Sequence, residues 1–197
     1  MDKLIISIIT AGTNTYNIIG DFMKNNLFKR TVIGFIFVSI AGSLFHFIFQ
    51  WSGYNRLAGI FFPVNESVWE HLKLIYLPFL IWSIIEYFVL RKDKSNIFTK
   101  AVSTLSGMAT IVIFYYTYTG ISGKEIEFLN ILSFFVGVAV AFAVDYLMIK
   151  SEKFKSNSYA TAGIIIFIIL GVLFVVFTFA PPLIPLFKDP QNLTYGI

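Results

Sequence analysis

The sequence predicts an all-α integral membrane protein, a polytopic bundle in which about five helices cross a lipid bilayer. Hydrophobic residues make up 57% of the 197-residue chain, and charged residues make up only 13%. A soluble domain is typically about 45–50% apolar and about 25% charged. A chain of this length cannot enclose so much apolar surface in a core of its own, so lipid must be its solvent. The third observation is a series of apolar runs, each close to the roughly 20 residues that a spanning helix needs.

Five such runs follow one another along the chain. Four are plainly apolar, and the third begins with small polar residues before it becomes apolar and aromatic. The predicted spans are Thr31–Gln50, Leu72–Leu90, Phe98–Thr119, Ile126–Ile149 and Ala160–Ala180. No linker or internal repeat divides them, which favours one transmembrane domain over residues 1–197. Residues 181–197 are rich in proline and also carry apolar side chains, so we expect them to fold back over the outer mouth of the bundle.

The first 28 residues have a different pattern. Apolar residues recur at helical spacing from Leu4 to Met23, but Thr13–Thr15 interrupts them. This pattern predicts an amphipathic helix that lies in the membrane interface. A cleavable signal peptide is the alternative, because Lys3 precedes a short apolar stretch, although no clear cleavage site follows it.

The basic residues predict the orientation of the spans. With the N-terminus inside, eleven of the fifteen Lys and Arg residues fall on the inner side. The positive-inside rule therefore predicts a cytoplasmic N-terminus and an outer C-terminus in the cell membrane. Because the basic residues flank apolar spans, the net charge of +4 indicates contact with anionic lipid rather than with nucleic acid.

The stretch PVNESVWEHLK, residues 63–73, gathers polar groups at the outer start of the second span. Ser67 and Glu70 have the spacing of a capping box, and Asn65 is a good N-cap residue. Lys73 can extend its ammonium group outward to the membrane surface. Helix capping therefore accounts for most of these residues, but not for His71.

The other histidine, His46, lies about four residues, or roughly 6 Å, from the outer end of the first span. The chain therefore has two histidines at the same predicted depth on consecutive spans. Two histidines with one carboxylate form a known zinc set, and carboxylate-rich variants suit iron or manganese. Without a metal, the same groups can act as general acid and base. The candidate catalytic residues are His46, Glu66, Glu70 and His71, and the candidate ligands of a divalent metal are His46, His71 and Glu70.

A haem held between the two histidines is a less favoured alternative, because both lie near the outer edge. Two further carboxylates, Glu86 and Asp145, lie near the inner ends of their spans. They predict either a proton or cation relay, or ion pairs with the nearby basic residues Arg91, Lys92 and Lys150.

Three function classes fit these features. The leading hypothesis is a membrane-embedded enzyme with an outward-facing His/Glu site that acts on a lipid-linked or small substrate. A small-solute or ion-coupled transporter and a structural or accessory membrane subunit are the alternatives, so enzymatic activity stays open at this point. The chain has no cysteine, and it lacks the P-loop, the dinucleotide-binding fingerprint and the nucleophile elbow.

Three segments carry a resemblance to a known family: NESVWEHLK, the terminal PPLIPLFKDP and the HFIFQWSG end of the first span. In these segments the chain resembles a family of small bacterial integral-membrane proteins catalogued as a domain of unknown function. The resemblance covers about Lys29 to Ile197. It implies a bacterial plasma-membrane protein and carries no activity, cofactor or catalytic residue.

Overall fold

The computed structural model describes residues 15, 20, 26–90 and 94–197, and every structural statement below concerns these residues. The predicted all-α fold class is confirmed, because five helices of the described chain are long and apolar enough to cross a membrane. These spans are α2 (Leu27–Trp51), α4 with α5 (Val68–His71 and Lys73–Val89), α6 (Ile97–Ser122), α7 (Glu127–Ser151) and α8 (Asn157–Phe179). Almost all of the predicted interfacial helix over residues 1–28 lies outside the described residues.

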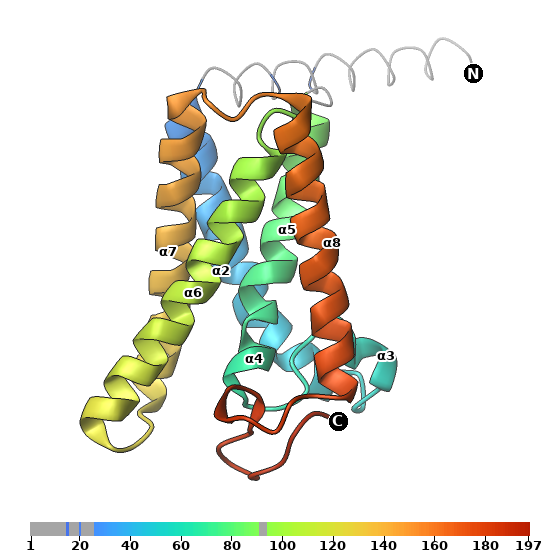
Figure 1. Ribbon diagram of the computed structural model, residues 1–197, viewed down its shortest axis with the longest axis vertical. Coiled ribbons are helices and arrows are strands. Elements are labelled where there is room, and N and C mark those ends of the chain that lie inside the picture. The colour runs from blue at the N-terminus through green and yellow to red at the C-terminus, as the bar shows by residue number, and fades with distance from the viewer. Residues whose placement is uncertain (1–14, 16–19, 21–25, 91–93) are drawn as a thin grey trace.

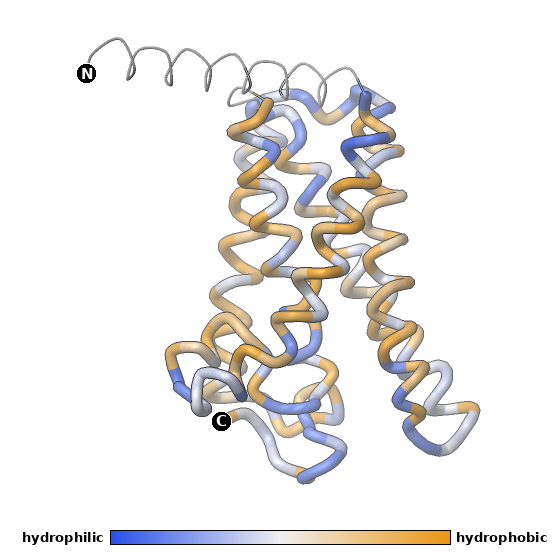
Figure 2. Tube along the Cα trace, turned by 180° about the vertical axis from the view of Figure 1, so that it is seen from behind, coloured by the Kyte–Doolittle hydropathy of each residue, from blue (hydrophilic) through white to orange (hydrophobic). Residues whose placement is uncertain are grey.

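The long helices run side by side, and short elements gather at one end of them (Figure 1). That end carries α3 (Arg56–Gly59), α4 and the C-terminal segment, residues 180–197, which contains the short helix η1 (Pro185–Phe187). We call it the C-terminal end, and we call the opposite end the basic end. Hydrophobic residues follow the middle of the helices and hydrophilic residues collect towards both ends, as expected of a bundle within a bilayer (Figure 2).

Capping residues explain why several helices extend beyond the predicted spans. Helix α2 begins at Leu27 because the Asn26 side chain accepts a hydrogen bond from the Lys29 amide at 3.1 Å. Helix α8 begins at Asn157, where Ser156 caps the Tyr159 amide. Hydropathy finds the apolar part of a helix, whereas caps determine where its hydrogen bonds begin.

Small residues allow close helix contacts in the middle of the bundle. A Cβ atom added to Gly107 of α6 would lie 2.8 Å from the carbonyl oxygen of Gly137 in α7. A Cβ atom added to Gly42 of α2 would lie 2.5 Å from the Leu74 carbonyl oxygen in α5. Proline at position 78, inside α5, cannot donate a hydrogen bond to that carbonyl. The glycine in α2 therefore packs against a carbonyl that lacks its usual donor within α5.

A buried cluster of two cations and two carboxylates joins four helices near the basic end. Glu86 of α5 lies 3.2 Å from Arg30 Nε and 2.7 Å from Lys100 Nζ, and Lys100 lies 2.6 Å from Asp145 of α7. All four side chains are buried, and their charges cancel. Both carboxylates are therefore ion-paired. The expected partner of Asp145, Lys150, is exposed and lies over the Tyr146 ring instead, while Arg91 and Lys92 lie outside the described residues.

The first prediction concerns Lys100, which contacts two carboxylates from two different helices. Lys100→Met leaves the cluster with a net negative charge inside the bundle, and losing one partner of a buried ion pair costs about 3–5 kcal/mol. We expect a free energy of unfolding lower by about that amount, measured on the purified protein in detergent. The control variant Lys150→Met removes an exposed lysine from the same end and should change stability by less than about 0.5 kcal/mol. Equal effects of the two variants would contradict a stabilising role for the cluster.

Candidate metal and acid–base site

The loop before α4 places the candidate residues through a short series of hydrogen bonds. Asn65 Oδ1 accepts from the Ser67 amide at 3.0 Å, and Ser67 Oγ accepts from the Glu70 amide at 3.3 Å. The predicted capping roles of Asn65 and Ser67 are therefore present. Glu70 does not complete the capping box, because its carboxylate accepts from the Val64 amide at 3.1 Å instead.

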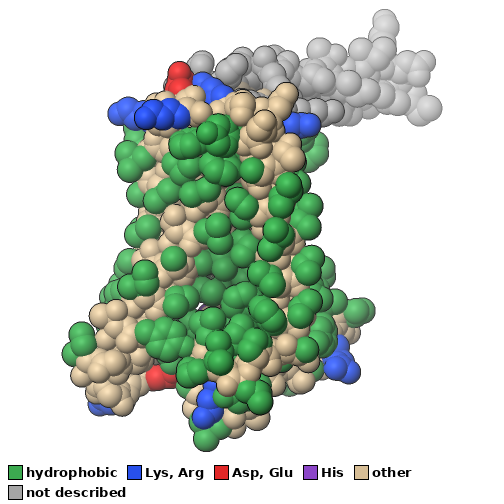
Figure 3. Space-filling model, viewed as in Figure 1, with side chains coloured by type: hydrophobic (Ala, Val, Ile, Leu, Met, Phe, Trp, Pro, Cys, Tyr) green, Lys and Arg blue, Asp and Glu red, His purple; other side chains and the backbone are tan. Residues whose placement is uncertain are grey.

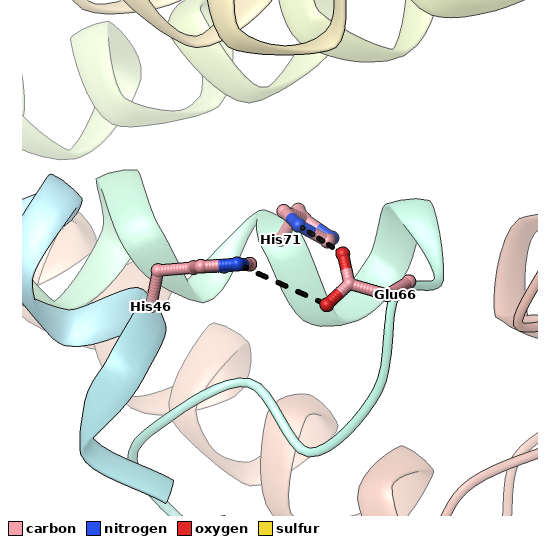
Figure 4. A group of neighbouring side chains, drawn as sticks. All are labelled: His46, Glu66 and His71. Carbon is pink, nitrogen blue, oxygen red and sulfur yellow. Dashed lines mark ion pairs between the residues drawn. The ribbon is translucent and has the colours of Figure 1, made fainter. Parts of the chain in front are cut away.

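His46 near the end of α2, Glu66 in the loop and His71 at the end of α4 converge at the C-terminal end (Figure 4). Glu66 Oε2 lies 3.3 Å from His71 Nε2, and Glu66 Oε1 lies 3.8 Å from His46 Nε2. The two imidazole centroids are 5.2 Å apart. About a third of each side chain is exposed, between 30% and 37%, so the cluster is accessible to a ligand.

The backbone fixes the ring orientation of His71. Its Nδ1 lies 2.9 Å from the carbonyl oxygen of Ser67, one helical turn earlier. A carbonyl oxygen only accepts, so Nδ1 must carry the proton of this hydrogen bond. Nε2 is consequently the nitrogen that faces Glu66. Metal-binding histidines are commonly oriented in this way, with the second ring nitrogen donating to a carbonyl or carboxylate.

A positive charge is required between His71 Nε2 and Glu66. In the neutral ring with a proton on Nδ1, Nε2 presents a lone pair, and the carboxylate presents only lone pairs. A separation of 3.3 Å is stable when either a proton or a metal cation lies between them. The hydrogen bond with His71 lowers the pKa of Glu66, and the charges of both histidines add to this effect against burial and the charge of Asp189. Glu66 is therefore a carboxylate at neutral pH.

The geometry fits one divalent ion. Zinc binds nitrogen and carboxylate oxygen at about 2.0–2.2 Å, which places tetrahedral ligand atoms about 3.3 Å apart. The distance from His71 Nε2 to Glu66 Oε2 already has this value, and the distance from His46 Nε2 to the other carboxylate oxygen, Oε1, exceeds it by half an ångström. One ligand atom from each of the three residues lies within 4.8 Å of the others. Three protein ligands leave a coordination position open, as in catalytic zinc sites.

Glu70, a candidate ligand in the sequence, does not join this cluster. Its Oε2 accepts from Lys73 Nζ at 2.7 Å, and its Oε1 lies 2.9 Å from the Thr178 hydroxyl of α8. The prediction that Lys73 extends to the membrane surface is wrong. Lys73 is only 1% exposed, and it also donates to the carbonyl of Gly59 at 2.8 Å, because suitable acceptors surround it inside the protein.

Sequence reasoning assigned Lys73 to the membrane surface and did not identify Thr178. The spacing of Glu70 and Lys73 gave one signal, because residues three apart on a helix are neighbours. Nothing in the sequence linked them to Thr178, which is more than a hundred positions away and is fully buried.

The C-terminal segment packs against α4, on the same end of the bundle as the site (Figure 1). The Phe187 ring lies 5.0 Å from Trp69 and 5.1 Å from Phe177. Asp189 accepts from the amides of Gln191 and Asn192 at 2.7 and 3.2 Å, and from the Glu66 amide at 3.4 Å. Burial opposes ionisation of Asp189, but these N–H donors outweigh it and lower its pKa. Asp189 therefore connects the C-terminal segment to the residue that faces both histidines.

The fold and the site together define a polytopic helical membrane protein with a two-histidine, one-carboxylate cluster at one end. Residues 21–197 match a family described as a family of unknown function, DUF6512. The chain therefore belongs to this family, which covers all five candidate spans and the C-terminal segment. No curated protein matches the chain, and no solved structure does.

The second prediction concerns Asp189, which is 1% exposed and holds several N–H groups. Asp189→Ala leaves these buried donors without their acceptor, at a cost of about 1–3 kcal/mol. We expect a lower melting temperature and faster proteolysis of the C-terminal segment. Gln191→Ala is the control, because the Gln191 side chain is exposed and its backbone amide still binds Asp189. Unchanged proteolysis of Asp189→Ala would contradict this role.

Proposed function

We propose that this protein is a membrane-embedded enzyme whose active centre is formed by His46, Glu66 and His71 around one divalent metal ion of the zinc type. The observation that carries the proposal is the meeting of three ligand atoms from two separate parts of the chain, within 4.8 Å of one another. The Ser67 carbonyl fixes the ring orientation that aims His71 Nε2 at this point. Hydrogen bonds of this kind support metal ligands in known sites.

The reaction class that suits the site is hydrolysis or group transfer at an ester or phosphoester. A bound divalent ion would supply a Lewis acid that polarises the carbonyl or phosphoryl oxygen of the substrate. His46, Glu66 and His71 would hold the ion. In hydrolysis, the oxygen of water bonds to the acyl carbon or phosphorus, the bond to the leaving oxygen breaks, and that oxygen takes up a proton.

A lipid-linked substrate is supported by the side chains beside His46. The His46 ring contacts Phe47 at 5.1 Å, and Phe47 stacks on Trp51 at 5.7 Å. Phe47 and Trp51 are 45% and 66% exposed and lie at the end of a span, where aromatic residues mark the membrane–water interface. A substrate with an apolar anchor would reach the cluster along this surface.

A transporter is less well supported. Between the two polar ends, the core contains Val38, Ile75, Phe79, Val138 and Ala141, each with no exposed surface. This packed layer lies between the histidine cluster and the ion pairs of Glu86 and Asp145. Its buried polar groups in the described chain include hydroxyls such as those of Ser39 and Ser103, and no charged side chain connects the two ends. The remaining alternative is an accessory subunit, which zinc binding without enzymatic activity would favour.

We also propose that the basic end faces the cytoplasm of a bacterial cell and that the site faces outward. This orientation is supported by four basic residues at the basic end of the described chain: Arg30, Lys94, Lys100 and Lys150. Basic residues favour the cytoplasmic side of a membrane. Figure 3 shows Lys and Arg side chains near both ends and hydrophobic side chains between them.

The third prediction tests the metal site. Isothermal titration with Zn²⁺ should give one site on the purified protein, and His46→Ala, His71→Ala and Glu66→Gln should each weaken it by at least about tenfold. Glu152→Gln is the control, because Glu152 is exposed at the basic end. Glu70→Gln should lower stability but retain zinc, because Glu70 pairs with Lys73.

Melting curves of the three site variants separate loss of a ligand from loss of folding. In lipid nanodiscs, a chelator should abolish hydrolysis of phospholipid or lipid-phosphate substrates, and added Zn²⁺ should restore it. Zinc affinity that none of the three substitutions changes would overturn the site. Zinc binding with no activity on any ester or phosphoester lipid would favour the accessory role.

The fourth prediction tests the orientation, for which the absence of native cysteine makes single-cysteine labelling direct. Lys124→Cys and Gln191→Cys at the C-terminal end should react with a membrane-impermeant maleimide in intact cells. Lys153→Cys at the basic end should react only after permeabilisation. The opposite labelling pattern would reverse the proposed orientation.

A further inference from the structure

A groove of about 720 Å³ runs between α5 and α8, on surfaces distinct from the histidine cluster. Its walls are mainly apolar side chains of these two helices, among them Leu80, Ile84, Ile168 and Val172. Three of them are strongly exposed, Ile84 at 48%, Ile168 at 59% and Val172 at 55%. Because α5 and α8 are both candidate membrane spans, a ligand enters this groove from the hydrocarbon layer rather than from water.

The wall near Tyr76 is apolar although tyrosine carries a hydroxyl group. The Tyr76 hydroxyl donates to the carbonyl oxygen of Phe167 in α8 at 2.8 Å, so the polar atom is satisfied within the protein. A Cβ atom at Gly171 would lie 2.8 Å from that hydroxyl. The glycine therefore allows Tyr76 to close against α8, and the ring presents carbon to the groove.

The groove is somewhat longer than one leaflet is thick. Its lining extends from Tyr76 to Tyr87 on α5 and from Ile164 to Val176 on α8, which is about 16 Å and about 18 Å at 1.5 Å per residue. One leaflet contributes about half of the 30 Å hydrocarbon core. A hydrocarbon chain of ordinary membrane length therefore fits along the groove.

The polar lining is concentrated towards the basic end. The groove includes Ser83, Tyr87 and Lys94, and Lys94 is exposed just before the start of α6. A small neighbouring cavity shares Ser83 and Tyr87 and extends to Asn96 and Lys100. The groove is thus apolar along its length and cationic at one end, which matches an amphiphile that has a negatively charged headgroup.

We propose that this groove binds one anionic phospholipid of the leaflet at the basic end, with an acyl chain between α5 and α8 and its phosphate beside Lys94. The uncharged part of the lining binds the chain through apolar contact, and the lysine provides the preference for a net negative headgroup. This inference does not depend on the proposed enzyme activity.

Native mass spectrometry of the full-length protein released from detergent tests the proposal. Phosphatidylglycerol and phosphatidylcholine with identical acyl chains are the probes. We expect one phosphatidylglycerol to bind about fivefold more tightly than phosphatidylcholine, since a lysine near the membrane surface contributes about 1 kcal/mol. Lys94→Gln should remove this preference and retain binding, whereas Lys153→Gln, an exposed lysine outside the groove, should leave it unchanged.

A matched pair on α8 tests the acyl site. Ile168 lines the groove and Ile169 does not, although the two are 59% and 52% exposed. Ile168→Trp should fill the groove and weaken binding of both lipids at least tenfold, and Ile169→Trp should have no effect. Equal binding of the two lipids to the unaltered protein, or equal effects of the two tryptophan variants, would overturn the proposal.

Discussion

Lipid cannot hydrate a charge, and this constraint explains how the buried lysines of the described helices are paired. Lys100 near the basic end and Lys73 near the C-terminal end are each almost completely buried. Each is neutralised by carboxylates of the protein, Lys100 by Glu86 and Asp145 and Lys73 by Glu70. Isolated charges at these depths would be costly, and paired charges connect helices. In the part of the chain that the structure describes, the layer between the two ends then contains no charged side chain.

The same constraint separates the two glutamates of the loop and α4. Ser67 caps α4, so Glu70 follows one turn inside the helix and faces the buried lysine. Glu66 precedes the helix, and its carboxylate is left for the two histidines. One glutamate thus stabilises the fold while the other forms a partly exposed site. Because Lys73 already neutralises Glu70, the charge of Glu66 is available to a proton or a cation.

The parts of this structure that depend on local sequence were predictable, and the parts that depend on contacts between helices were not. Apolar runs predicted the five spans, since hydrophobic length alone determines whether a helix can cross a bilayer. The equal depth of His46 and His71 was also readable from their distances to span ends. The choice between Glu66 and Glu70 was not, because it depends on where Lys73 points. That direction is determined by acceptors in α8 and at the end of α3, which no spacing rule connects to it.

A site that is one-third exposed requires rigid support to hold its geometry. Each residue of the cluster has such support: α2 carries His46 on a regular helix, the Ser67 carbonyl holds His71, and Asp189 accepts from the Glu66 amide. The Asn65 side chain also donates to the carbonyl of Gly196 at 3.1 Å, which attaches the loop to the C-terminal segment. Groups held in this way lose little freedom when they bind a ligand, so more of the interaction energy appears as affinity. The C-terminal segment is therefore best understood as part of the site, because it positions the loop that carries Glu66.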